Sequence, residues 1–221
     1  MVGYNMFMKN SVAITKRQKE LLQIIYSHIK TSGYPPSFEE MREKLKVSSN
    51  QSVIDLLEKL EDLRMIERDE GSARGIKITS KGYSTLGVSG LAPILGTTAA
   101  GVYIESFEEM NFKWVEIPKN IFPNEKIHRS EEVFVVKVNG DSMVNAFIDD
   151  GDMLLVNKAK DFKSGDIVVA RTHAGTTVKR FVADGGKRYL KPENPNYANI
   201  VIIPGEVHFE GKVIMNLSKV K

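Results

Sequence analysis

The sequence predicts an α+β chain of two domains: an N-terminal domain of three helices with a β-hairpin, and a mostly-β C-terminal domain. Before residue 64, apolar residues recur at helical spacing in three segments; after residue 90, short alternating runs are separated by turn residues. The stretch between them is rich in glycine and small hydroxyl residues, which is typical of a linker. The expected parts are a flexible tail at 1–14, the first domain at 15–80, a linker at 81–90 and the second domain at 91–221.

Capping residues mark where the helices of the first domain begin. The N-cap signals are Thr15 with Gln18, Ser37 with Glu40, and Ser49 or Asn50 for the third helix. Two short strands, 65–68 and 75–78, then flank an Asp-Glu-Gly-Ser turn. Three helices followed by a β-hairpin define a winged helix-turn-helix, which places its third helix in the major groove of DNA. A small helical domain that binds no nucleic acid is the alternative interpretation.

The third helix has an apolar face that packs on the core and an opposite polar face. Residues near the start of a recognition helix reach base edges, so we predict base contacts from Ser49, Asn50, Gln51, Ser52, Ile54 and Asp55. In these contacts Gln51 would bind adenine bidentately, Asp55 would accept from cytosine, and Ile54 would touch a thymine methyl. Candidate phosphate contacts are Lys16, Arg17, Lys19, Arg74 and Lys77. The alternative for each of these residues is an ordinary solvated side chain.

The distribution of charge favours phosphate contacts in the first domain. Residues 1–82 carry 14 Lys and Arg against 11 Asp and Glu, whereas residues 83–221 carry 17 of each, so the net charge of +3 is N-terminal. The sequence contains neither an apolar run of membrane-spanning length nor the charged start of a signal peptide. The absence of cysteine excludes disulfides, thiol catalysis and cysteine-ligated zinc. We therefore expect a cytoplasmic protein without cofactor or metal.

A serine and a lysine of the second domain form a candidate catalytic pair. Ser142 follows the alternating strand 133–138 and a Gly-Asp turn, which lifts its hydroxyl and main-chain N–H out of the sheet. Lys179 lies on the apolar face of the strand 176–181, where burial favours a neutral amine that can act as a general base. The alternatives are a plain turn serine and a lysine that reaches water over an edge strand.

Five motifs of the second domain resemble, in order and approximate spacing, those of LexA-type repressors: Gly140-Asp141-Ser142-Met143, Asp150-Gly151-Asp152, Gly165–Ala170, Thr177-Val178-Lys179-Arg180 and Pro192-Glu193-Asn194-Pro195. Residues 15–79 resemble the DNA-binding domain of the same family. The resemblance implies a winged helix joined to a LexA/signal peptidase-like domain, a serine endopeptidase in which Ser142 is the nucleophile and Lys179 the base. It also implies that the chain cuts its own bond between Ala100 and Gly101. Composition alone would favour a flexible loop there.

The resemblance further implies partners and a setting. Such a repressor binds double-stranded operator DNA as a homodimer held by the C-terminal domain. It acts on the nucleoid of a bacterium, or is phage-encoded, and it cleaves itself when a RecA–single-stranded DNA filament signals DNA damage, the SOS response. The other classes are a membrane signal peptidase, a phage-type or specialised repressor with another operator and trigger, and a regulator that never cleaves. The absence of a membrane span opposes the first, and the presence of the complete motif set opposes the third.

Three features depart from the family pattern. Ile54 replaces an expected polar residue, so the operator sequence is not inherited from the resemblance. Thr98 stands where valine is frequent, and the segment from Gly101 to Ser142 is longer than usual, with the extra residues expected around 122–130. None of these departures removes a candidate catalytic residue.

Overall fold

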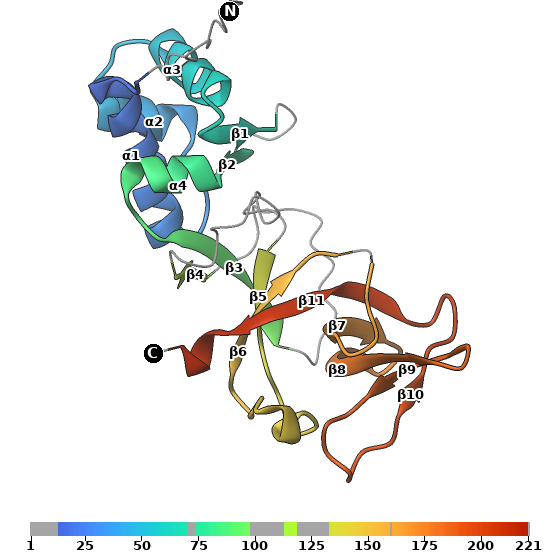
Figure 1. Cartoon of the computed structure of the whole chain (residues 1–221). Coiled ribbons are helices and arrows are strands. Elements are labelled where there is room, and N and C mark those ends of the chain that lie inside the picture. The colour runs from blue at the N-terminus through green and yellow to red at the C-terminus, as the bar shows by residue number, and fades with distance from the viewer. Residues whose placement is uncertain (1–12, 70–73, 98–112, 119–132, 160, 221) are drawn as a thin grey trace, which may run out of the picture. The chain divides into compact units, whose positions relative to one another are not determined.

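The computed structural model describes residues 13–69, 74–97, 113–118, 133–159 and 161–220. Apart from residues 32–34, which group with the second part, the chain divides into two compact units between Gly87 and Val88 (Figure 1). The first unit is mainly helical and the second mainly β. The predicted fold class, with a winged helix-turn-helix followed by a mostly-β domain, is confirmed.

The first unit contains, in chain order, α1 (Lys16–Ser32), α2 (Phe38–Leu45), α3 (Asn50–Asp62), β1 (Ile66–Arg68), β2 (Ile76–Ile78) and α4 (Ser80–Leu86). The two strands pair in antiparallel orientation and form the wing. Both predicted capping boxes are present. The hydroxyl of Thr15 accepts from the N–H of Gln18 at 3.2 Å, and the hydroxyl of Ser37 accepts from that of Glu40 at 3.3 Å. Ser49 caps α3 in the same way.

The core of the first unit forms where the apolar faces of the helices meet the wing. Its fully buried side chains include Leu21, Leu22, Ile25, Met41, Leu45, Leu57, Leu60, Ile66 and Ile78. The sequence predicts an inward face of α3 formed by Val53, Leu56, Leu57, Leu60 and Leu63. Val53, Leu57 and Leu60 are buried as predicted, whereas Leu56 and Leu63 are only partly buried. Burial of such a side chain contributes about 1.5–3 kcal/mol, so this core determines which face of α3 meets solvent.

The linker predicted at 81–90 is corrected by the structure, because a helix, α4, occupies most of it. The hydroxyl of Thr79 caps this helix by accepting from the N–H of Gly82 at 3.2 Å. Tyr83 is buried edge-on against Tyr26, with ring centroids 6.1 Å apart. These contacts with the rest of the unit stabilise a helix that its glycine and hydroxyl composition does not indicate. Only residues 87–89 separate it from the next strand.

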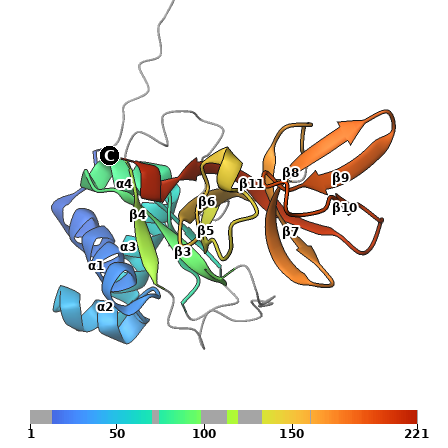
Figure 2. The same cartoon turned by 90° about the horizontal axis from the view of Figure 1, so that it is seen from below.

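The second unit is built on one sheet, whose strand order is β10-β9-β8-β7-β11-β6-β5-β3-β4 (Figures 1 and 2). Its strands are β3 (Gly90–Thr97), β4 (Trp114–Ile117), β5 (Val133–Lys137), β6 (Met153–Asn157), β7 (Ile167–Thr172), β8 (Gly175–Asp184), β9 (Lys187–Lys191), β10 (Ile200–Val201) and β11 (His208–Asn216). All pairings are antiparallel except that of β3 with β5. The short β-rich runs at 133–138, 152–157, 167–171, 176–181, 188–191, 200–203 and 207–216 predict strands β5 to β11, whereas the sequence gives no such prediction for β3 and β4.

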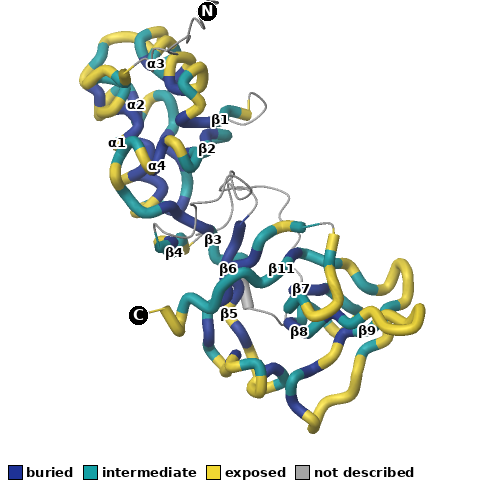
Figure 3. The backbone as a smooth tube through the Cα atoms, in the orientation of Figure 1, coloured by how far each residue is buried: buried dark blue, intermediate teal, exposed yellow. Residues whose placement is uncertain are grey.

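Strand β5 is buried on both faces, although its alternation predicted one. The expected residues Phe134, Val136 and Val138 pack in one cluster. Val133 and Val135 pack in a second cluster. The reason is that both faces of the sheet are covered at β5: Met143 and Val178 pack on one side, and Ala92 and Ile117 on the other (Figure 3). This buried strand leads directly into the loop that carries Ser142.

Candidate active site and DNA-binding surface

Ser142 lies in a tight loop directly after β5. Gly140 adopts φ +97°, a conformation that L side chains rarely take, and its N–H donates to Asp150 Oδ1 at 2.7 Å. On the other side of the serine, Met143 is buried in the core cluster of Phe134, and the 3₁₀ turn η3 (Val144–Ala146) follows. The loop is therefore held on both sides of Ser142.

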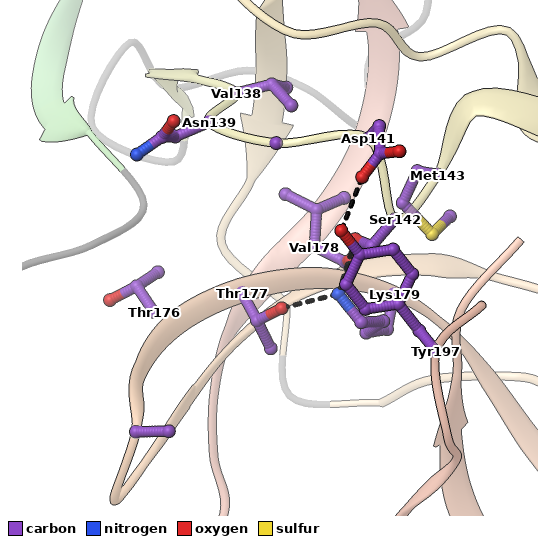
Figure 4. A pocket seen from close by; sticks show the side chains of 12 residues that line it. Val138, Asn139, Asp141, Ser142, Met143, Thr176, Thr177, Val178, Lys179 and Tyr197 are labelled. Carbon is purple, nitrogen blue, oxygen red and sulfur yellow. Dashed lines mark hydrogen bonds between the residues drawn. The ribbon is translucent and has the colours of Figure 1, made fainter. Parts of the chain in front are cut away.

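Lys179, on β8, meets this serine across a cleft of about 260 Å³ (Figure 4). Its Nζ lies 2.7 Å from Ser142 Oγ, 2.7 Å from Thr177 Oγ1 and 2.9 Å from the carbonyl oxygen of Val178. The residue is only 7% exposed. Burial lowers the pKa of the Lys179 amine from 10.5 to about 8, because the charged form loses its hydration. The structure thus brings together the two predicted catalytic residues, which lie far apart in the sequence.

The three contacts of Lys179 can be made by an ammonium, which donates to all three oxygens, and also by a neutral amine. Such an amine has two N–H groups and one lone pair. The N–H groups can donate to Thr177 Oγ1 and the Val178 carbonyl, and the lone pair can then accept the hydroxyl hydrogen of Ser142. With the amine neutral, this geometry would allow Ser142 to act as a nucleophile and Lys179 as its general base.

Other residues beside Ser142 and Lys179 are not predicted as site residues. Thr177 lies two positions before Lys179 on the same strand face, and this spacing is the sequence signal for its contact with the amine. Asp141, Asn194 and Tyr197 form hydrogen bonds beside Ser142. The last two come from a loop whose spacing to the serine follows no periodicity, so only the motif resemblance pointed toward that region.

Several predicted features lie outside the described residues: the tail 1–12, Thr98, the Ala100–Gly101 bond, the segment 122–130, and the tip of the wing at 70–73. The strand before the proposed cleavage site is described. β3 ends at Thr97, which pairs with Lys137 at the end of the parallel strand β5. Because parallel strands end at the same edge of a sheet, the chain after Thr97 begins at the edge from which the Ser142 loop also leaves.

In the first unit, the residues predicted to contact bases lie on α3 or at its N-cap, and all of them are at least partly accessible to solvent. Ser49, Asn50, Gln51 and Asp55 are exposed, and Ser52 and Ile54 are partly exposed. The amide of Gln51 donates to Asp55 Oδ1 at 2.8 Å. This bond uses one of the two N–H groups of the amide and leaves the other, with Oε1, for a base edge.

The candidate phosphate contacts differ in their surroundings. Lys16 and Lys19 are exposed, and Lys77 is partly exposed. Arg17 pairs with Glu20 at 2.7 Å and donates to the carbonyl of Leu45. Arg74 donates to the carbonyl of Pro35 at 3.2 Å and lies 3.8 Å from a carboxylate oxygen of Glu40. Both arginines therefore brace this unit internally, and their part in DNA binding stays a prediction.

Within the described part of the chain, no helix has the length and apolarity that a membrane span requires, and no cluster of potential metal ligands occurs.

Comparison with known proteins assigns both units. Residues 11–75 match the LexA DNA binding domain, and residues 93–214 match the Peptidase S24-like family. The LexA repressor of Geobacter sp. (strain M21) is 37% identical over 207 residues, which cover 91% of this chain and 95% of that protein. The LexA repressor of Roseiflexus sp. (strain RS-1) is 33% identical over 214 residues, 94% of this chain and 97% of the relative. The LexA repressor of Lacticaseibacillus casei (strain BL23) is 37% identical over 184 residues, which cover 82% of this chain and 86% of that protein.

Fold, site and comparisons define the class as transcriptional repressors in which a winged-helix DNA-binding domain precedes an S24-like peptidase domain. Within that class, the chain belongs to the family of LexA repressors. The resemblance drawn from the sequence motifs is confirmed.

Proposed function

We propose that this protein is a self-cleaving repressor, which binds operator DNA as a homodimer and inactivates itself by cutting its own chain between Ala100 and Gly101. The observation that carries the proposal is the 2.7 Å contact between Ser142 Oγ and Nζ of the buried Lys179. The parallel pairing of β3 with β5 supports cleavage within one chain. Thr97, three positions before Ala100, ends β3 at the same edge of the sheet from which the Ser142 loop leaves.

The cleavage follows from the two side chains. Neutral Lys179 takes the hydroxyl proton of Ser142 as Oγ attacks the carbonyl carbon of Ala100, and the main-chain N–H of Ser142 donates to the oxyanion. Lys179 then gives this proton to the nitrogen of Gly101, and the C–N bond breaks to leave an ester on Ser142. Water, deprotonated by Lys179, hydrolyses the ester and restores the hydroxyl. The products are residues 1–100 and 101–221.

The repressor half of the proposal rests on the exposed face of α3. Gln51 and Asp55 stand at its N-terminal end and are assigned to base edges, with Ser49, Asn50, Ser52 and Ile54 beside them. A homodimer held by the C-terminal domain would engage two half-sites at once, which multiplies the affinity of a single winged helix. A cut after Ala100, inside the second unit, removes that gain once the two fragments separate.

The trigger and setting follow from the resemblance to LexA-type repressors. We assign the trigger to a RecA–single-stranded DNA filament formed after DNA damage, and the location to the cytoplasm. A filament that stabilises the closed cleft would keep Lys179 buried and so favour its neutral form near neutral pH.

The test is to incubate the pure full-length protein at mildly alkaline pH and weigh the products by mass spectrometry. Two fragments, 1–100 and 101–221, are expected. Ser142→Ala should give none. Ser84→Ala, which changes an exposed serine of the other unit, should behave as the wild type. An intact wild-type chain, both alone and with RecA filament at neutral pH, would refute self-cleavage.

A further inference from the structure

A hydrogen-bonded cluster holds the residue immediately before the nucleophile. Both carboxylate oxygens of Asp141 accept hydrogen bonds: Oδ1 from the hydroxyl of Tyr197, and Oδ2 from the side-chain amide of Asn194 at 3.2 Å. The same amide also donates to the main-chain carbonyl of Asp141 at 3.1 Å. Side chain and backbone of Asp141 are thus fixed together. Figure 4 shows the hydrogen bond between Asp141 and Tyr197.

The orientation of Asn194 is itself determined. The residue is 7% exposed, and its Oδ1 accepts from the main-chain N–H of Asn196 at 3.0 Å. With its oxygen occupied there, the NH₂ group is directed to Asp141. A buried amide without hydrogen-bond partners is unfavourable, so the burial of Asn194 favours this orientation.

The segment that supplies Asn194 and Tyr197 also contacts the far side of the nucleophile. The main-chain N–H of Asn145, three residues after Ser142, donates to the carbonyl of Glu193 at 2.9 Å. The side chain of Glu193 accepts from Arg180 Nε at 2.6 Å. Arg180 directly follows Lys179 on β8, so one short segment connects the serine loop with the strand of the amine.

We propose that Asp141, Asn194 and Tyr197, here called the Asp141 clamp, are positioning residues that hold Ser142 Oγ at hydrogen-bonding distance from Lys179 Nζ. Tyr197 also lines the cleft and forms part of its wall. The inference rests on the proposed self-cleavage, and it assigns the clamp no proton transfer of its own. A displacement of about 1 Å between reacting groups lowers a rate by about 100-fold, which is the effect that the clamp prevents.

The clamp remains intact while the amine titrates. The hydrogen bond to Asp141 raises the pKa of the Tyr197 hydroxyl above its usual value of 10.0, so this group is still a donor where Lys179 loses its proton. Loss of the clamp should therefore lower the plateau of the cleavage rate and leave its pH midpoint unchanged. General loosening of the domain would instead hydrate Lys179, raise its pKa toward 10.5 and shift the midpoint upward.

The experiment measures the first-order self-cleavage rate of the full-length protein from pH 6 to 9.5, with labelling of Ser142 by a fluorophosphonate as a second readout. Asp141→Ala should lower the plateau about 100-fold. Tyr197→Phe, which removes one hydrogen bond and keeps the ring, should lower it about threefold to tenfold. Asp141→Asn retains an acceptor for Tyr197 and should fall between wild type and Asp141→Ala. Tyr189→Phe on β9 and Asp184→Ala at the end of β8 are the matched controls, expected at wild-type rates.

The possible outcomes distinguish a failure of the proposed self-cleavage from a failure of the Asp141 clamp alone. A wild type that neither cleaves nor reacts with the fluorophosphonate overturns the proposed function and this inference with it. A wild type that cleaves, with Asp141→Ala and Tyr197→Phe at the same rate, overturns the clamp alone. A raised midpoint in Tyr197→Phe also overturns it, in favour of a general structural role. If Asp141→Ala does not fold, Tyr197→Phe and Asp141→Asn decide the question.

Discussion

At the scale of single residues, the charge state of Lys179 controls the proposed chemistry. Burial alone lowers the pKa of its amine to about 8, against 10.5 for the ordinary value. Between these two pH values the unfolded chain binds one proton more than the folded chain. The contribution of Lys179 to the free energy of unfolding therefore increases as pH rises through this window, and below about pH 8 the folded state bears the cost of a buried ammonium.

The first prediction concerns the pH dependence of self-cleavage. The rate without any partner should rise with pH, reach half its maximum near the pKa of about 8 of Lys179, and then level off. Lys179→Arg should abolish cutting over the whole range because arginine stays protonated, and Ser142→Ala should do the same. Mass spectrometry of timed samples from pH 6 to 11 measures these rates. A cleavage rate that does not change with pH, or cutting by Lys179→Arg at the wild-type rate, would show that Lys179 does not act as the general base.

The second prediction separates base contacts from phosphate contacts in the first unit. Gln51→Ala should relax the preference at one base pair, a loss of ~1–3 kcal/mol of discrimination, because a bidentate contact disappears. Lys16→Ala should weaken binding to every sequence alike and reduce its salt dependence. Binding isotherms on an operator selected from random duplexes, and on its single-base variants at several salt concentrations, distinguish the two effects. Equal binding of the wild type to all duplexes would contradict both assignments.

At the scale of elements, α4 shows how a close approach determines a helix. A Cβ added to Gly82 would lie 2.3 Å from the carbonyl oxygen of Met65 and 2.7 Å from Cγ2 of Ile78. Only glycine therefore allows the helix to pack this tightly on the wing. A glycine in this segment suggests a flexible chain, whereas in the structure its lack of a side chain allows close packing.

The third prediction follows from this packing. Gly82→Ala should destabilise the first unit by ~1–3 kcal/mol, since the backbone of Met65 has to shift to admit a methyl group. Thermal unfolding followed by circular dichroism measures the loss, and Ser84→Ala, exposed on the same helix, is the control. Equal stability of the two variants would show that α4 can move away from the wing at no cost.

Elements set by local chemistry were predictable from the sequence, and those set by distant contacts were not. The capping boxes at Thr15 and Ser37 involve residues three positions apart, so the local sequence was sufficient to predict them. Helix α4 and the strand β3 depend on packing against segments elsewhere in the chain. The same holds within the site. Lys179 was found by strand alternation and resemblance, while Tyr197 reaches Asp141 from 56 positions away without any periodic signal.

At the scale of the whole molecule, the chain separates its two activities between two units and places the proposed cut between the winged helix and most of the second unit. The fourth prediction tests the position of this cut. Gly101→Asp should block self-cleavage and leave operator binding intact, because a charged side chain cannot enter a cleft that accepts glycine. Fragment masses and operator binding of this variant are compared with those of Ser142→Ala. Cleavage at another bond, or unimpaired cutting of Gly101→Asp, would refute the assignment.

The position of β3 determines how the two fragments are held together after cleavage. A break after Ala100 leaves β3 on the N-terminal fragment, although this strand pairs with β4 and β5 in the sheet of the other unit. Leu91 and Ala92 on it are almost completely buried. The backbone ladder and the buried side chains both persist when one peptide bond outside the strand is broken. The covalent cut and the separation of the fragments are therefore two distinct steps.

The fifth prediction is that the two fragments stay associated after cleavage and separate only when β3 leaves the sheet. Immediately after complete cleavage, native size-exclusion chromatography should show fragments 1–100 and 101–221 eluting together, with separation on standing or in mild denaturant. Leu91→Ala should hasten this separation, because a buried leucine truncated to alanine costs ~2–5 kcal/mol. Ser89→Ala, just before the strand, is the control. Immediate separation of the wild-type fragments would mean that β3 contributes too little to hold them, and that the operator is released by the cut itself.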